Sequence, residues 1–166
     1  PEDVKRIAGA GHEIGIHGYD HSLIYRQDPA TFEADVSRAL AAVRKVHTGE
    51  ILGYRAPTFS IREDTLWALD ILQKLGLKYD SSIFPFKRER YGIPGSPLGP
   101  HEIKPGLIEF PMSVVQILGR PVPVGGGGYF RLYPYAFTSW AVERLNREGR
   151  PVMTYLHPWE FDPDQP

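Results

Sequence analysis

The sequence predicts an α/β fold built from parallel βαβ units, arranged as an open doubly wound sheet or as a (β/α) barrel. Short apolar strands alternate with amphipathic helices along most of the 166 residues, at the spacing that parallel βαβ units require. His17, Arg55, Asp80 and His157 each stand at the C-terminal end of a predicted strand. Barrel enzymes gather their active-site groups at this edge, so the four positions favour the barrel.

The first part of the chain predicts a helix, a strand and a second helix. Residues 1–10 resemble the end of a helix, with apolar residues at helical spacing and Gly9 and Gly11 as stop signals. Residues 13–17 alternate polar and apolar side chains, which predicts a strand that ends in a loop at His17. Apolar residues three and four apart predict the next helix over residues 29–46, closed by Gly49.

The middle of the chain repeats this alternation. Residues 51–54 predict a short strand that ends before Pro57, residues 63–75 an amphipathic helix, and residues 77–80 another short strand. Residues 84–106 are rich in proline, glycine and charge, which predicts a long surface excursion of the kind that often carries binding function.

The last third predicts a strand over residues 107–115, a helix over residues 135–147 and a final strand over residues 151–157. The glycine run at residues 125–128 does not match a phosphate-binding loop, because it lacks the following Lys-Ser/Thr and the strand-to-helix context. No internal repeat is evident. No window reaches the roughly 18 apolar residues of a membrane span, so none is predicted.

Composition excludes several classes of function. The formal charge is −1 and the pI about 6.7, so the chain lacks the cationic face that phosphate backbones attract, and we expect no nucleic-acid partner. The sequence contains no cysteine, which excludes disulfide scaffolds, thiolate zinc sites and cysteine nucleophiles. The cellular compartment stays open.

Two histidines suggest a metal site. His17 and His21 form an H-x-x-x-H pair, whose imidazoles can close on one ion if the intervening residues make a single turn, and Gly18 permits such a turn. Without thiolates, the pair favours zinc or another first-row divalent ion, with a further ligand from elsewhere. The alternative is two solvent-facing loop histidines.

Three more polar residues are candidates for chemistry. The guanidinium of Arg55 suits a carboxylate at the strand mouth, against the alternative of a surface salt bridge. Asp80 is either an orienting carboxylate or the cap of a turn. His157 can titrate near neutrality and donate a proton to a leaving amine, whereas the alternative is a satisfied core histidine.

Together these motifs resemble the NodB-homology polysaccharide deacetylases of the carbohydrate esterase 4 type. The resemblance covers nearly the whole chain and runs through residues 13–21, Arg55-Ala56-Pro57, residues 79–82 and Leu156-His157-Pro158. Residues 55–60, 126–132 and 157–161 are similar to the subgroup found with bacterial exopolysaccharide and exosortase loci. The resemblance implies a distorted (β/α) barrel and one deacetylase domain over residues 1–166.

The resemblance also implies roles for the candidate residues. His17 and His21 would bind a divalent metal, with zinc expected, and His157 would be the catalytic acid. Arg55 would orient a catalytic aspartate and Asp80 would tune His157. The expected partner is an N-acetylated polysaccharide or oligosaccharide. Residues expected to contact it are Pro57, Phe59, Tyr129 and Trp159, the last two by stacking on a sugar ring.

The chain departs from the family in one motif. The acidic pair that supplies the family's general base and carboxylate ligand has no match here, and the tryptophan of the Asp80 motif is absent. The chain starts at Pro1 within a helical pattern and stops at Pro166, so we expect truncation at both ends and the missing first strand upstream. Two alternatives stay open: a small-amide hydrolase of the same barrel family, and a non-catalytic carbohydrate-binding descendant.

Overall fold

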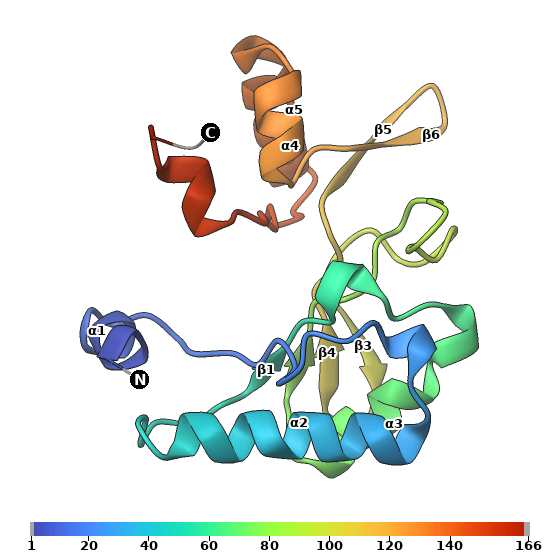
Figure 1. Cartoon of the computed structure of the whole chain (residues 1–166). Coiled ribbons are helices and arrows are strands. Elements are labelled where there is room, and N and C mark those ends of the chain that lie inside the picture. The colour runs from blue at the N-terminus through green and yellow to red at the C-terminus, as the bar shows by residue number, and fades with distance from the viewer. Residues whose placement is uncertain (1, 165–166) are drawn as a thin grey trace.

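A four-stranded sheet forms the centre of the protein (Figure 1). The computed structural model describes residues 2–164, so Pro1 and Pro166 lie outside the described part of the chain. The strands lie in the order β1-β2-β4-β3. Their bounds are β1 (Gly53–Tyr54), β2 (Tyr79–Asp80), β3 (His101–Lys104) and β4 (Leu107–Glu109). Strands β1, β2 and β4 run parallel, as predicted, and β3 pairs antiparallel with β4.

Two predicted strands are reduced to isolated bridges. Ile16 pairs in parallel with Tyr54 and extends the sheet beyond β1, and Gly126 pairs with Tyr155. The first segment cannot continue as a strand because the chain turns at Gly18, whose φ is +77°. The predictions of full strands over residues 13–17 and 151–157 were therefore too long. The parallel strands with helices between them agree with the predicted α/β fold class.

Two helices supply most of the larger core. Helix α2 (Pro29–Arg44) begins at the N-cap Asp28, whose carboxylate accepts a hydrogen bond from the backbone N–H of Thr31 at 2.8 Å. It ends two residues before the predicted end. Its buried Phe32 packs edge-to-face on Tyr54 of β1, and α3 (Trp67–Lys74) adds a second apolar face. This core holds the strand that leads to Arg55.

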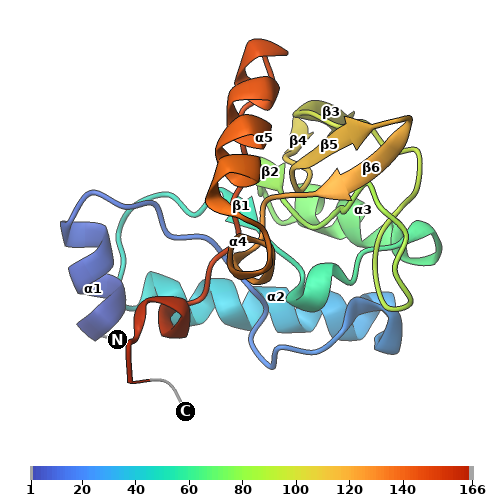
Figure 2. The same ribbon diagram turned by 90° about the horizontal axis from the view of Figure 1, so that it is seen from above.

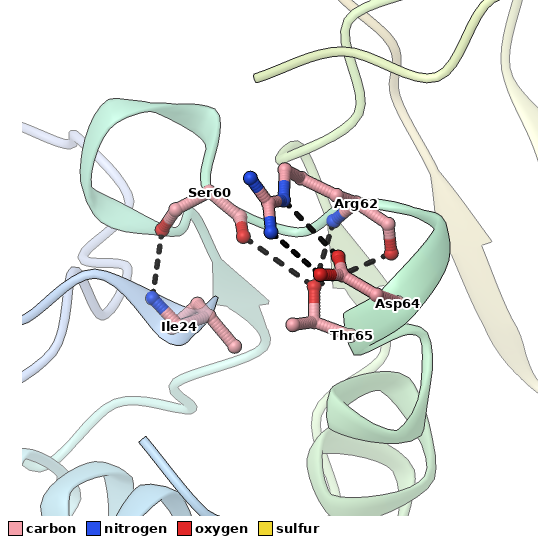
Figure 3. A network of polar contacts seen from close by, with 5 residues as sticks. All are labelled: Ile24, Ser60, Arg62, Asp64 and Thr65. Carbon is pink, nitrogen blue, oxygen red and sulfur yellow. Dashed lines mark hydrogen bonds and ion pairs between the residues drawn. The ribbon is translucent and has the colours of Figure 1, made fainter. Parts of the chain in front are cut away.

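The predicted helix over residues 63–75 is divided into a 3₁₀ turn (Glu63–Thr65) and α3. Figure 3 shows why the turn is stable: the Thr65 hydroxyl accepts a hydrogen bond from the backbone N–H of Arg62 at 2.8 Å. The Ser60 hydroxyl accepts from the backbone N–H of Ile24 at 3.1 Å. The loop after β1 is thereby tied to the loop after His17.

A second, smaller layer stands at the other end of the molecule (Figures 1 and 2). The hairpin of β5 (Val114–Ile117) and β6 (Arg120–Pro123) packs against α5 (Tyr135–Arg147), which matches its predicted bounds. The sequence analysis missed this hairpin, α4 (Gly127–Leu132), and β3 within the predicted surface excursion. It also joined β4 to β5, which Pro111 separates because it has no backbone N–H to donate.

Helix α1 (Glu2–Gly9) extends away from the sheet in both views and has no buried residue. No helix within residues 2–164 is long and apolar enough to cross a membrane.

Candidate active site

Most of the predicted site residues meet at one pocket of about 750 Å³. Its wall is formed by the loop after Ile16, the turn after β1, the start of α4 and the last turn of the described chain. The predicted residues on this wall are His17, His21, Phe59, Tyr129, His157 and Trp159. The structure therefore brings the two proposed metal ligands and the proposed acid together, from segments far apart in the sequence.

The ring of His17 is fixed by the backbone of Arg55, directly after strand β1. Its Nδ1 lies 2.7 Å from the backbone carbonyl oxygen of Arg55, and because a carbonyl only accepts, Nδ1 donates. Nε2 is then the nitrogen left with a lone pair for a ligand. Burial lowers the pKa of His17, and the neighbouring His21 lowers it further while the carbonyl contact opposes them. The neutral form that a metal requires is favoured.

The loop that carries His21 is fixed by Asp35 of α2. The backbone N–H groups of Tyr19 and Asp20 each donate to the Asp35 carboxylate at 2.9 Å, and Asp35 is buried. A side chain at Gly18 would crowd this carboxylate. The sequence analysis missed Asp35, although one acidic residue on the apolar face of a predicted helix was a usable signal. Asp35 sets the approach of His21 to His17.

The histidine pair has the spacing of two ligands on one ion. The ring centroids of His17 and His21 are 5.0 Å apart with an angle of 75° between the planes. With Zn–N distances of about 2.1 Å and tetrahedral geometry, two imidazoles on one ion would have centroids roughly 5 Å apart. Within residues 2–164, no group of three potential ligands forms. The Asp20 carboxylate pairs with Arg38 at 3.0 Å instead.

His157 is held on several sides at the start of a 3₁₀ turn (Pro158–Phe161). Its Nε2 lies 2.7 Å from the Tyr155 hydroxyl, and its ring stacks on Trp159 with centroids 4.0 Å apart. Its backbone N–H donates to the Glu160 carboxylate at 2.7 Å, and Nδ1 lies 3.7 Å from the same oxygen. The imidazole therefore has a fixed orientation at the pocket wall.

Asp80 makes no hydrogen bond or ion pair with His157 in the described residues 2–164, and its role toward His157 stays a prediction. It is fully buried, with its Oδ1 accepting a hydrogen bond from the Ser82 hydroxyl at 2.5 Å and with Glu109 of β4 beside it. Burial raises the pKa of Asp80 to about 6 and raises the pKa of Glu109 well above its usual value. Two adjacent buried carboxyls cannot both ionise easily, so they share a proton.

The hydrogen bonds of Arg55 go to the segment that follows β2. Its Nε donates to the Ser81 carbonyl at 3.0 Å and its Nη2 to the Ser81 hydroxyl at 2.8 Å. The guanidinium lies 5.2 Å from the ring centroid of Tyr155. Arg55 thus ties the end of β1 to the segment after β2, and its predicted role toward a catalytic aspartate, which has no match in this sequence, stays a prediction.

Comparison with known proteins agrees with these motifs. Residues 1–79 match the family model for polysaccharide deacetylases, and residues 81–166 match a domain of unknown function, DUF3473. The first 79 residues are thus similar to polysaccharide deacetylases. The boundary between the two matches falls at Asp80, and the pocket takes residues from both sides of it.

Two curated relatives match about half of the chain. A peptidoglycan deacetylase-like protein, FGM2, of Gibberella zeae is 29% identical over 83 residues, which are 50% of this chain and 24% of the relative. The peptidoglycan deacetylase of Helicobacter pylori is 37% identical over 83 residues, 49% of this chain and 27% of the relative. The matched regions thus span about a quarter of each relative.

A solved structure shows the same fold. A candidate polysaccharide deacetylase of Mycobacterium smegmatis superposes with a TM-score of 0.63 at 24% identity, covering 96% of this chain and 54% of that chain. The deacetylase fold therefore extends through the part that matches DUF3473.

The predicted substrate residues have different positions around this pocket. Phe59 and Tyr129 line it, and Trp159 lines it while covering one face of His157. Pro57 is buried, and Thr58 and Phe59 line the pocket in its place. Thr58 and Phe59 have φ angles of +55° and +52°, a strained conformation that turns Phe59 toward the pocket.

The sequence analysis missed several further residues of the pocket wall. They include Tyr91, Met112, Tyr155 and Glu160. Only tertiary contacts place these residues, because Tyr91 stands in an irregular loop and Met112 between two strands. The Tyr155 hydroxyl and the Glu160 carboxylate add polar groups directly beside His157.

Proposed function

We propose that the protein is a metal-dependent deacetylase that hydrolyses acetamido groups of an N-acetylated glycan. The observation that carries this proposal is the meeting of the His17 and His21 pair with His157 on one pocket wall, in a chain whose first 79 residues match the polysaccharide deacetylase family model. Amide hydrolysis needs an electrophilic carbonyl, an activated water and a proton for the leaving amine. The histidines can serve the first and last of these needs.

The proposed metal is a divalent ion, with zinc preferred for an imidazole site without thiolates. Nε2 of His17 and the ring of His21 would hold it, and the carbonyl of Arg55 would fix the His17 ring from behind. When bound, such an ion supplies Lewis-acid polarisation of the carbonyl and lowers the pKa of a bound water.

His157 would supply the proton for the leaving group. As the C–N bond breaks, the nitrogen keeps the bonding pair and takes a proton from the imidazolium, so that acetamide and water become acetate and a free amine. Nε2 now faces the Tyr155 hydroxyl, which lines the same pocket. Burial raises the pKa of Tyr155, so this hydroxyl stays protonated and neutral. The substrate nitrogen would replace the Tyr155 hydroxyl as the partner of His157 Nε2.

The proposed substrate is a polymer or oligomer of N-acetylated sugars. Aromatic rings on the pocket wall, including Tyr129 and the half-exposed Trp159, offer faces on which a sugar ring can stack. The curated relatives are named for peptidoglycan, another N-acetylated glycan. Participation in bacterial exopolysaccharide production is the narrower proposal, supported by the motifs around Arg55, Gly126 and His157.

Acetate release by the full-length protein tests this function. The experiment uses N-acetylglucosamine oligomers with zinc, with a chelator, and with zinc restored after chelation. Acetate that appears with zinc, disappears with the chelator and returns on restoration supports the proposal. Glycan binding without acetate release would identify a carbohydrate-binding descendant, and hydrolysis of small amides alone would identify the other rival; either result overturns the proposal.

A further inference from the structure

The carboxylate of Glu160 is buried directly against His157. Only 8% of the Glu160 side chain is exposed, and its Oε2 accepts the backbone N–H of His157 at 2.7 Å. The same oxygen lies 3.7 Å from Nδ1 of the imidazole. The nearest cation on its other side is Arg131, whose Nη2 lies 3.7 Å from Oε1 and whose side chain is 71% exposed. The two distances are equal, but the Arg131 side chain is more exposed than that of His157, which is 32% exposed, so solvent screens the Arg131 pair more strongly.

The glycine run provides the space for this carboxylate. A Cβ atom at Gly127 would overlap both carboxylate oxygens of Glu160, whereas a Cβ at Gly128 would meet nothing within 4 Å. Gly127 is itself fixed, because its backbone N–H donates to the carbonyl oxygen of Tyr155 at 2.9 Å. The absence of a side chain at Gly127 thus lets Glu160 approach the segment that carries His157.

The imidazole is held so that the two ring edges have different surroundings. Nδ1 faces Glu160, Nε2 faces the Tyr155 hydroxyl at the pocket, and Trp159 covers the ring face. A negative charge at this distance stabilises the imidazolium, whichever nitrogen carries the proton in the neutral ring. A proton donor needs its charged form to be populated before the leaving group departs.

We propose that Glu160 is the positioning residue of His157: its carboxylate holds the backbone of His157 and places a negative charge beside Nδ1, in the place that the family motif gives to Asp80. This inference rests on the proposed function, in which His157 is the proton donor. The hydrogen-bond partners of Asp80 in the described residues include Ser82 and Glu109.

The pH dependence of kcat tests the proposal. In the full-length protein, Glu160→Gln should lower kcat by roughly tenfold or more, with KM little changed, and should move the alkaline limb of the profile to lower pH. Glu160→Asp should recover part of the loss. Glu143→Gln, on the exposed side of α5, is the control and should leave the profile unchanged. An unchanged kcat and profile in Glu160→Gln would overturn the proposal, as would a shifted limb in Asp80→Asn alone.

A second pair of variants changes the glycine run that leaves space for the Glu160 carboxylate. Gly127→Ala should displace Glu160 and reproduce the shift of the alkaline limb, whereas Gly128→Ala should not. Equal profiles in the two alanine variants would contradict the inference.

Nuclear magnetic resonance separates this inference from the proposed function. The ¹⁵N shifts of the His157 ring at one fixed pH should show a smaller protonated fraction in Glu160→Gln than in the wild type. If the wild type releases no acetate, the proposed function fails, yet the ring shifts still test Glu160. Identical shifts in wild type and Glu160→Gln would reject its role even in an active deacetylase.

Discussion

The two halves of the pocket are supported in different ways. His17 follows a backbone bridge to β1, its ring is fixed by a carbonyl, and its loop is fixed by the buried Asp35. His157 stands in a short turn with exposed neighbours and is held by its own local contacts with Tyr155, Trp159 and Glu160. The difference suggests that the proposed metal side is positioned by the large core, whereas the proposed proton-donor side is positioned within a few residues.

The largest loss of activity is expected from changes at the proposed metal side. Replacing His17 or His21 with alanine should reduce bound zinc to background and acetate release by roughly a thousandfold or more, since metal-assisted polarisation is worth several kcal/mol. Metal content by mass spectrometry and acetate release should fall together. His47→Ala, which lies outside the pocket, is the control. Retained zinc in both single variants would refute the shared metal site.

Changes at the proposed proton-donor side should lower kcat without loss of metal. His157→Ala should lower kcat by about a hundredfold to ten-thousandfold, the usual contribution of general acid catalysis, and leave zinc content unchanged. Single-turnover acetate release and metal analysis on the same preparation provide the measurement. A parallel loss of zinc would show that His157 belongs to the metal side, and the division between the halves would be wrong.

A smaller effect is expected where the core supports the metal loop. Asp35→Asn keeps one acceptor oxygen but loses the charge that holds two backbone N–H groups, so zinc affinity should fall about tenfold to a hundredfold. Asp28→Asn removes a similar charge from an exposed helix cap and should leave zinc affinity unchanged. Competition with a chromogenic chelator measures both. Equal affinities for Asp35→Asn and wild type would show that the loop needs no such support.

The smallest expected effect is the contribution of the buried Asp80 and Glu109 pair to the stability of the protein. Burial raises the pKa of Asp80 to about 6 and raises the pKa of Glu109 well above its usual value, so the folded state holds protons that the unfolded chain has already released. The free energy of unfolding should therefore fall as pH rises from about 4 through 6 and beyond. Glu109→Gln should flatten this decline. Denaturant unfolding at a series of pH values measures it, and a decline of equal slope in the variant would contradict the shared proton.

Local sequence patterns predicted the parts of the fold that local physics controls. Helix α5 begins and ends where its apolar spacing indicated, and α2 begins at its Asp28 cap. The hairpin tip was not predictable in this way, because Leu118 adopts a φ of +50° that its side chain disfavours. Helix α4 begins in glycines, which have low helix propensity, and tertiary contacts stabilise it.

The site was predictable where a residue type carries its own chemistry. Histidines and strand ends indicated His17, His21 and His157, which the structure brings to one pocket. The partners were not predictable, because a carboxylate's role depends on which chain segment lies opposite it. Asp80 therefore pairs with a glutamate 29 positions later rather than with His157, and Glu160 occupies the place beside the histidine.

The contacts of Ser81 and Ser82 with the preceding strand have a consequence for recombination. Ser81 receives the guanidinium of Arg55, and the Ser82 hydroxyl accepts the backbone N–H of Ala56 at 2.8 Å. A chimera joined near Asp80 would keep His17 and His21, the proposed metal ligands, and would exchange in one step the proposed proton donor His157 and the aromatic residues Tyr129 and Trp159 that are proposed to contact sugar. The two serines and Glu109 would be the residues to retain at the crossover, so that a library of exchanged C-terminal halves could vary glycan preference on a constant metal site.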